Sequence, residues 1–155
     1  MRKQLQLFVM FLTLGTMTAY SQADTTYAVR PLELRMEIAD MYPQKYAARH
    51  NLGDFSLTLR ADSAIVYLPY VGEVYTPVIN DDGLNFSHKY SEMKVGRTKK
   101  GDAAVITFEV RHHSSAYQFS ITAWPDRRAS LVVSPSGADR CTYYGFWNGN
   151  IALIK

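Results

Sequence analysis

Apolar and polar residues alternate along most of this chain, which is the pattern of strands that bury one face and leave the other in water. The first alternating segment covers residues 32–39, and its apolar positions are Leu32, Leu34, Met36 and Ile38. Several of these residues are good helix formers and Pro31 suits a first helical position, so a helix over residues 32–40 is the alternative. The alternation is complete on both faces, which favours a strand because periodicity is the stronger signal.

The most apolar stretch of the chain is residues 65–72, with the sequence IVYLPYVG. Alternating residues 55–60 precede it, and the short turn 61–63 between the two segments predicts a hairpin. So dense a run of β-branched and aromatic residues predicts a buried strand. Pro69 has no N–H to donate to a neighbouring strand, so this strand must lie at an edge of its sheet, or bend or end at the proline.

Turn-forming clusters divide the second half of the chain at regular intervals, at residues 80–83, 99–102, 112–115, 125–128 and 135–137. Between them, residues 105–111 and 117–124 alternate cleanly. Shorter strands are expected in residues 89–97, 131–134 and 140–144. The connection 44–53 is the one place where we expect a helical turn.

The sequence therefore predicts an all-β fold, a single domain over residues 32–155 that forms an antiparallel meander of about eight or nine strands. A meander of this length closes as a small barrel or packs as a two-sheet sandwich, and the pattern alone does not separate the two. The chain is long enough for one domain with its own core.

The N-terminal residues 1–21 have the order of a secretory signal peptide, with Arg2 and Lys3 first, an apolar core over residues 5–14, and small residues near Ser21. Cleavage is expected after Ser21, with cleavage after Ala23 as the alternative. Residues 22–31 then form a polar lead-in to the domain. The apolar core is too short for a convincing membrane span, although a membrane anchor is the alternative.

We therefore expect an exported protein, periplasmic or extracellular, and not a lipoprotein, because no cysteine lies near the cleavage point. Removal of residues 1–21 removes two of the 17 Lys and Arg residues and none of the 14 Asp and Glu residues, so the net charge falls from +3 to +1. The longest basic blocks are the pairs Lys99-Lys100 and Arg127-Arg128. The sequence thus gives little support for nucleic-acid binding.

Cys141 is the single cysteine of the chain, so the domain has no internal disulfide to stabilise it. Its strand-like neighbours favour a small buried hydrophobic residue over the two alternatives, an intermolecular bridge and a catalytic thiol. The stability of the domain must then come from packing.

Four segments together resemble an uncharacterised family: residues 36–43 (MEIADMYP), 62–72 (DSAIVYLPYVG), 107–110 (TFEV) and 143–145 (YYG). The chain resembles domain-of-unknown-function family 4251, a family of exported Bacteroidota proteins, over residues 33–150. The most specific part is residues 67–72. The resemblance implies an antiparallel β domain outside the cytoplasm, and it implies no reaction, ligand or catalytic residue.

Candidate chemistry is sparse. The motif Gly-x-Ser-x-Gly is absent, and Glu73, Asp102 and Glu109 are the carboxylates that could meet across strands. Adjacent His112 and His113 would point to opposite faces of a strand and share a metal only in a turn, where His50, His88, Asp102 or Glu109 could approach. A solvated turn is the favoured interpretation. We assign no catalytic residue, metal ligand or cofactor.

The aromatic content is the more informative signal, because Tyr and Trp combine flat apolar area with a hydrogen-bonding group. Tyr67, Tyr70, Tyr75 and Trp147 are the predicted ligand-binding residues. The competing interpretation places such rings in the core, as for Tyr67, which shares a face with Ile65.

We therefore expect a non-catalytic binding or interaction module of the cell envelope, whose partner is a glycan, peptide or protein. One alternative is an envelope hydrolase with a carboxylate and histidine site. Another is a structural envelope component.

Overall fold

The computed structural model describes residues 33–73 and 84–151 of the 155-residue chain. The expected signal peptide, the polar lead-in, Tyr75 and the turn at 80–83 lie outside the described residues. Eight strands make up the fold: β1 (Leu34–Pro43), β2 (Ser56–Arg60), β3 (Ser63–Leu68), β4 (Leu84–Arg97), β5 (Ala104–His112), β6 (Ser115–Ala123), β7 (Arg128–Pro135) and β8 (Cys141–Gly149).

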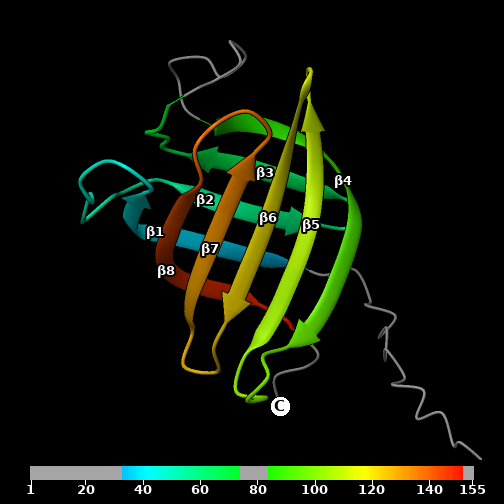
Figure 1. Cartoon of the computed structure of the whole chain (residues 1–155). Coiled ribbons are helices and arrows are strands. Elements are labelled where there is room, and N and C mark those ends of the chain that lie inside the picture. Colours follow the sequence, from blue (N-terminus) through cyan, green and yellow to red (C-terminus); the bar gives the residue numbers. More distant parts are fainter. Residues whose placement is uncertain (1–32, 74–83, 152–155) are drawn as a thin grey trace, which may run out of the picture.

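The strands form a closed barrel in which each pairs antiparallel with its neighbours along the chain and β8 pairs with β1 (Figure 1). In Figure 1, β1, β2 and β3 run across one side of the barrel, and β5, β6 and β7 cross their direction on the other side. The all-β meander is confirmed, and the closure is the barrel. Among the described residues, no helix has the length and apolar character needed to cross a membrane.

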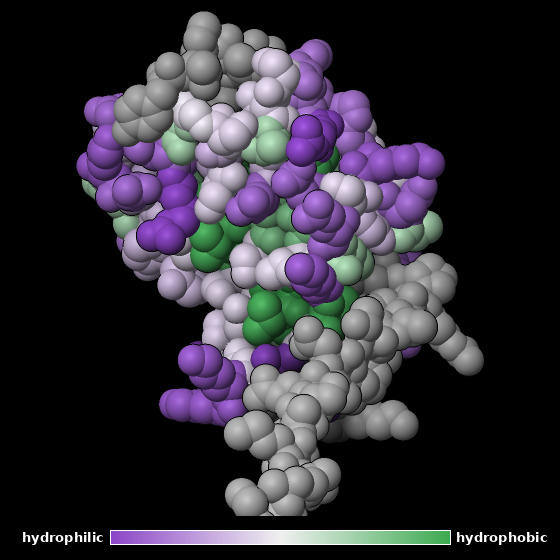
Figure 2. Space-filling view, turned by 45° about the vertical axis from the view of Figure 1, so that its right-hand side comes forward, coloured by the Kyte–Doolittle hydropathy of each residue, from purple (hydrophilic) through white to green (hydrophobic). Residues whose placement is uncertain are grey.

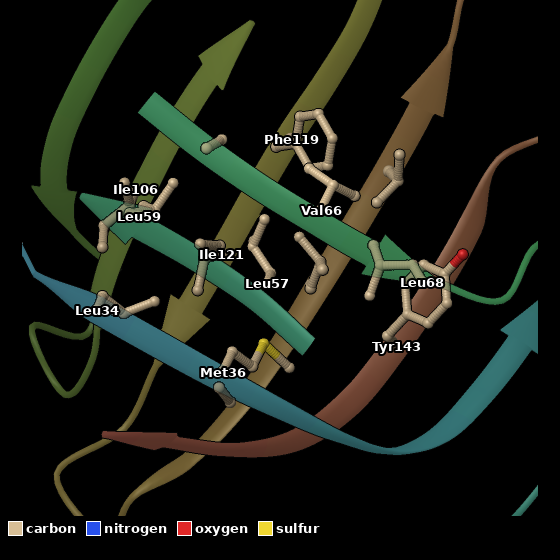
Figure 3. Packing of buried hydrophobic residues seen from close by; sticks show 14 of the residues in the cluster. Leu34, Met36, Leu57, Leu59, Val66, Leu68, Ile106, Phe119, Ile121 and Tyr143 are labelled. Atoms are coloured by element: carbon tan, nitrogen blue, oxygen red, sulfur yellow. The ribbon is translucent and has the colours of Figure 1, made fainter. Parts of the chain in front are cut away.

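The interior is filled by side chains from all eight strands, as expected for a barrel of this strand number. The labelled residues of Figure 3 point inward from both sides, and they are Leu34, Met36, Leu57, Leu59, Val66, Leu68, Ile106, Phe119, Ile121 and Tyr143. The alternation predicted for residues 105–111 and 117–124 is confirmed, with one face of each strand buried. The face on the β4 side is largely hydrophilic in Figure 2, with hydrophobic side chains visible in a recessed area.

Strand β1 confirms the strand interpretation of residues 32–40 and excludes the helix. Its alternation continues to Pro43 through a β-bulge between Ile38 and Asp40. The extra residue shifts the inward positions, so that Ile38 and Met41 are buried while Tyr42 points outward. A bulge re-aims the side chains that follow it.

The apolar stretch at 65–72 differs in part from its prediction. The hairpin of β2 and β3 is confirmed, and β3 ends at Leu68, directly before Pro69. Of the alternatives for Pro69, the strand therefore ends at the proline, and the edge position is excluded because a closed barrel has no edge strand. The prediction of a buried strand is wrong. Ile65 and Tyr67 lie on the outer wall, and only the alternate residues of β3 are buried. A barrel strand has just one inner face, whatever the polarity of its other face.

Three smaller predictions have clear outcomes. Residues 44–53 contain no helical turn, and Arg49 instead pairs with Met41 in an isolated antiparallel bridge. Strand β4 begins at Leu84, earlier than the expected residues 89–97. Cys141 is buried in β8, as expected, and its pKa is raised by that burial.

Candidate binding site on the outer wall

The predicted ligand-binding residues do not form one surface. Trp147 is 6% exposed and its Nε1 donates to the Trp124 carbonyl oxygen at 2.8 Å. Tyr70 is half-buried, and its hydroxyl donates to the Asp139 carbonyl oxygen at 2.7 Å. Tyr67 is 43% exposed, on the outer face of β3. Of the three that the structure describes, Tyr67 alone presents its ring to solvent.

A different set of aromatic residues gathers on the outer wall where β8 pairs with β1. We call this set the aromatic strip, and it consists of Phe146, Tyr144, Tyr42 and His50. Phe146 and Tyr144 are 58% and 44% exposed and lie two residues apart on the outer face of β8. That spacing places them about 7 Å apart along the strand.

Tyr42 and His50 extend the strip across β1. The Tyr42 ring meets the Tyr144 ring edge-on, with centroids 5.3 Å apart and planes at 89°. His50 meets Tyr42 in the same manner at 5.6 Å and 80°. In an edge-to-face pair the ring that offers its edge has neither flat face covered by its partner, and the other ring has one face covered.

The inner face of β8 explains why these rings are outside. Tyr143, Gly145 and Trp147 point inward, so Tyr144 and Phe146 must point outward. At Gly145, any Cβ would overlap the backbone carbonyl oxygen of Glu37, so β1 and β8 approach closely here. Only glycine allows this approach.

A hollow of about 480 Å³ lies beside the strip, and its lining residues are Ala39, Asp40, Trp124, Arg128, Ala129, Tyr144, Gly145 and Phe146. The Asp40 carboxylate contacts the His50 Nδ1 at 2.9 Å. The Arg128 guanidinium donates to Asp126 at 2.6 Å, and this bond holds the Asp126 pKa below its ordinary value. The hollow thus places an acceptor and a donor beside two exposed rings.

A second aromatic surface lies on the outer wall of β2 and β3. Here Phe55 and Tyr67 stack face to face, with centroids 5.2 Å apart and planes at 28°. Ile65 lies beside them on the same face of β3. The two rings cover one another, so one flat face of each is already occupied.

The carboxylates named for a hydrolase do not converge. Glu109 forms an ion pair with Arg111 at 2.9 Å on the outer wall. Glu109 and Glu92 both line a hollow of about 260 Å³. Asp102 lies in the turn beyond the other end of β5 and bonds to Thr98. Glu73 is paired with Lys45 at 2.6 Å. Glu109 therefore lies within β5, whereas Asp102 lies in the turn before that strand.

His113 is exposed in the turn between β5 and β6, as the favoured interpretation expected, whereas His112 is the last residue of β5 and is partly buried. His112 Nδ1 lies 2.7 Å from His88 Nε2, and the His112 and His113 ring centroids are 4.1 Å apart. Burial, and then the neighbouring His113 and His88, lower the pKa of His112. Within residues 33–73 and 84–151, no three His, Cys, Asp or Glu side chains are arranged to hold a metal ion.

Sequence reasoning missed Tyr42 and Phe146, and it did not assign Tyr144 to a site. The signal for β8 was present, since Gly145 stands between Tyr144 and Phe146 in a strand whose inward positions are apolar. Tyr42 carried no such signal, because its outward direction depends on the bulge in β1.

Comparison with known proteins identifies the family. A search of curated proteins found no match. The family model described as "Domain of unknown function (DUF4251)" matches residues 18–147, most of the chain and all of the barrel up to Trp147. This protein belongs to that domain-of-unknown-function family.

Proposed function

We propose that this protein is a non-catalytic binding module that works outside the cytoplasm and holds an extended glycan on the aromatic strip. The observation that carries the proposal is the pair of exposed rings, Tyr144 and Phe146, beside a hollow that also presents Asp40 and Arg128. Exposed apolar patches of this kind mark interaction surfaces.

The chemistry of the strip suits sugar rings. The apolar C–H face of a pyranose packs on a Tyr or Phe ring, while its hydroxyl groups need both acceptors and donors. Tyr144 and Phe146 supply the rings, the Asp40 carboxylate accepts, and the Arg128 guanidinium donates. A linear glycan that follows β8 would meet the two rings in succession.

The closed barrel argues against an extended peptide as the ligand. Peptides that bind sheet proteins commonly add a strand to a free edge. Strand β8 has β7 and β1 as neighbours, and where β1 extends beyond its pairing with β2 its backbone bonds to residues 49–55, so the strip offers no long unpaired edge. The ligand must then be recognised through side chains, which favours sugar rings.

The test is a panel of soluble bacterial envelope glycans, examined by isothermal titration calorimetry with the purified protein. Tyr144→Ala and Phe146→Ala should each weaken binding at least about tenfold, a loss of about 1.4 kcal/mol. Tyr67→Ala is the matched control, because Tyr67 and Tyr144 are 43% and 44% exposed.

Circular dichroism of each variant confirms that the barrel persists. A loss of binding in Tyr67→Ala with none in Tyr144→Ala would move the site to β3. If the folded native protein binds none of the glycans, the proposal that its ligand is a glycan is wrong.

The location proposal rests on residues 1–21 and has its own test. N-terminal sequencing of the protein recovered from outside the cytoplasm should begin at Gln22, with Ala19 and Ser21 as the small residues before the cut. Recovery of an intact N-terminus from the cytoplasm would overturn this part of the proposal.

A further inference from the structure

A cluster of three histidines lies apart from the aromatic strip, where β4 and β5 extend beyond their pairing. The ladder between these strands includes the pair Tyr90 and Val110. His88 and His112 each lie two residues beyond that pair, on the same side of their strands. Two strands therefore bring two imidazoles directly opposite one another.

The imidazoles rest on an apolar support. The His112 ring stacks on Phe86, with centroids 4.8 Å apart and planes at 20°. Phe86 is itself buried and contacts Tyr117 at 5.2 Å between centroids. An apolar support restricts the orientation of a ligating ring, while the exposed His88 leaves the pair open to water.

His113 completes the cluster through its backbone conformation. It lies in the turn between β5 and β6 and has a φ of 52°. This left-handed conformation, which histidine adopts more readily than most residues, places its ring against that of His112. In a regular strand these adjacent histidines would point to opposite faces, and the turn at His113 is what lets the two rings lie close together.

We propose that His88 and His112 bind a divalent late transition-metal ion, Cu²⁺ before Zn²⁺, through Nε2 and Nδ1. Two nitrogens that ligate at about 2.0 Å and 90° lie about 2.8 Å apart, whereas tetrahedral ligation separates them by about 3.3 Å. The observed separation is 2.7 Å. The two nitrogens are thus close enough to ligate one ion once the rings turn, and imidazole nitrogen binds Cu²⁺ more tightly than Zn²⁺ in the general affinity order of the divalent metals.

Binding requires a small rearrangement that conserves protons. One imidazole now donates its N–H to the other across this 2.7 Å contact. When the ion binds, the donor ring takes its other tautomer, and both rings turn their lone pairs toward the metal. Water supplies the remaining ligands, since the described residues hold no third ligand in place.

The choice of metal follows from the ligand type. Imidazole nitrogen suits Cu²⁺, Ni²⁺ and Zn²⁺, whereas Mg²⁺ and Ca²⁺ require oxygen ligands. The rings that contact the pair, those of Phe86 and His113, supply no oxygen, and Ser115, which pairs with His112 across β5 and β6, carries a neutral hydroxyl and no carboxylate. Mg²⁺ and Ca²⁺ should therefore not compete.

The experiment uses the purified chain without an affinity tag, treated with a chelator and then dialysed. Cu²⁺ and Zn²⁺ titrations are followed by calorimetry and, for Cu²⁺, by the visible absorption of the bound ion. Native protein should bind one Cu²⁺ per chain, more tightly than Zn²⁺, and an excess of Mg²⁺ should leave the affinity unchanged.

Variants separate this pair from the other imidazoles. His88→Gln and His112→Gln should each weaken Cu²⁺ binding at least about tenfold, the lower limit for loss even of an outer-shell partner. His50→Gln, an exposed histidine on the aromatic strip, is the matched control and should stay within about twofold. His113→Asn keeps a residue that tolerates positive φ and should also retain binding.

Three results would overturn the proposal: no saturable Cu²⁺ binding by native protein, unchanged binding in His88→Gln, or an equal loss in His50→Gln. An equal loss in His113→Asn would overturn the assignment of two ligands. Circular dichroism of each variant shows whether a loss of binding comes from unfolding.

Discussion

The two aromatic surfaces of the barrel each have one tyrosine of nearly equal exposure, and they differ in how that ring meets its aromatic neighbour. Tyr67 in β3 and Tyr144 in β8 expose nearly the same fraction of their surface. Tyr67 lies flat on Phe55, whereas Tyr144 meets Tyr42 edge-on beside a hollow. Exposure alone therefore does not define a binding surface, and exposed rings beside a hollow with polar groups are the better criterion.

The backbones beneath the two surfaces differ as well. Strands β2 and β3 pair in unbroken register, while β1 and β8 pair around a bulge and a close approach at Gly145. Both irregular features lie under the aromatic strip. The strip thus depends on backbone geometry that regular alternation would not produce.

The largest expected effect comes from a side chain at Gly145. Gly145→Ala should lower the free energy of unfolding by about 3 kcal/mol, because the new Cβ overlaps the Glu37 carbonyl oxygen and must separate β1 from β8. Gly96→Ala in β4 is the control, since its Cβ meets no atom within 4 Å. Urea unfolding measures both. Equal midpoints for the two variants would show that β1 and β8 are less closely joined than this contact implies.

The second effect compares neighbouring tyrosines on the two faces of β8. Tyr143→Phe removes a buried hydroxyl that donates to the Pro69 carbonyl oxygen at 2.7 Å, and it should lower the free energy of unfolding by about 1–2 kcal/mol. Tyr144→Phe, on the outer wall, should change it by less than about 0.5 kcal/mol. Thermal unfolding of both variants tests the difference, and a reversed order would mean that the two faces have been exchanged.

The sequence predicted the fold well because strand alternation is a local signal. Residues 105–111 and 117–124 have apolar residues on one face and polar ones on the other, and both faces are where the pattern placed them. The proline effect was also local, since β3 ends directly before Pro69. Cys141 followed from its strand-like neighbours in the same way.

The candidate site was hard to predict because it depends on relations between distant residues. Residues 65–68 are apolar on both faces, so no polarity contrast shows that Tyr67 is outside. Tyr42 and Tyr144 meet only because β1 pairs with β8, about a hundred residues later in the chain. A pattern read along the chain contains neither the bulge nor that pairing.

A smaller effect is expected from the stacked pair on β2 and β3. Phe55→Leu keeps apolar volume but removes the ring from Tyr67, and should lower the free energy of unfolding by about 0.5–1.5 kcal/mol. Phe146→Leu, on an exposed ring of the strip, should cost less than about 0.5 kcal/mol. Urea unfolding distinguishes the two. A larger loss in Phe146→Leu would mean that the strip stabilises the barrel instead of being free for a ligand.

The smallest effect tests whether the inner face of β8 is sealed beneath the strip. Burial raises the pKa of the Cys141 thiol above its ordinary value of 9.0, so the folded chain keeps this proton when the unfolded chain begins to lose it. A raised pKa contributes stability that is complete well below pH 9 and declines as the pH rises through 9, by at most about 0.4 kcal/mol at pH 9.0, where the unfolded thiol is half ionised. Cys141→Ala should remove that decline.

Thiol labelling is the sharper measurement of the same burial. At pH 9.0, a neutral alkylating reagent should label Cys141 in native protein far more slowly than in urea-unfolded protein, because labelling requires both a thiolate and access. Labelling of the native thiol at the unfolded rate would show that solvent reaches the barrel interior at the start of β8. The aromatic strip would then lie over an opening, and its hollow would be continuous with the core instead of separate from it.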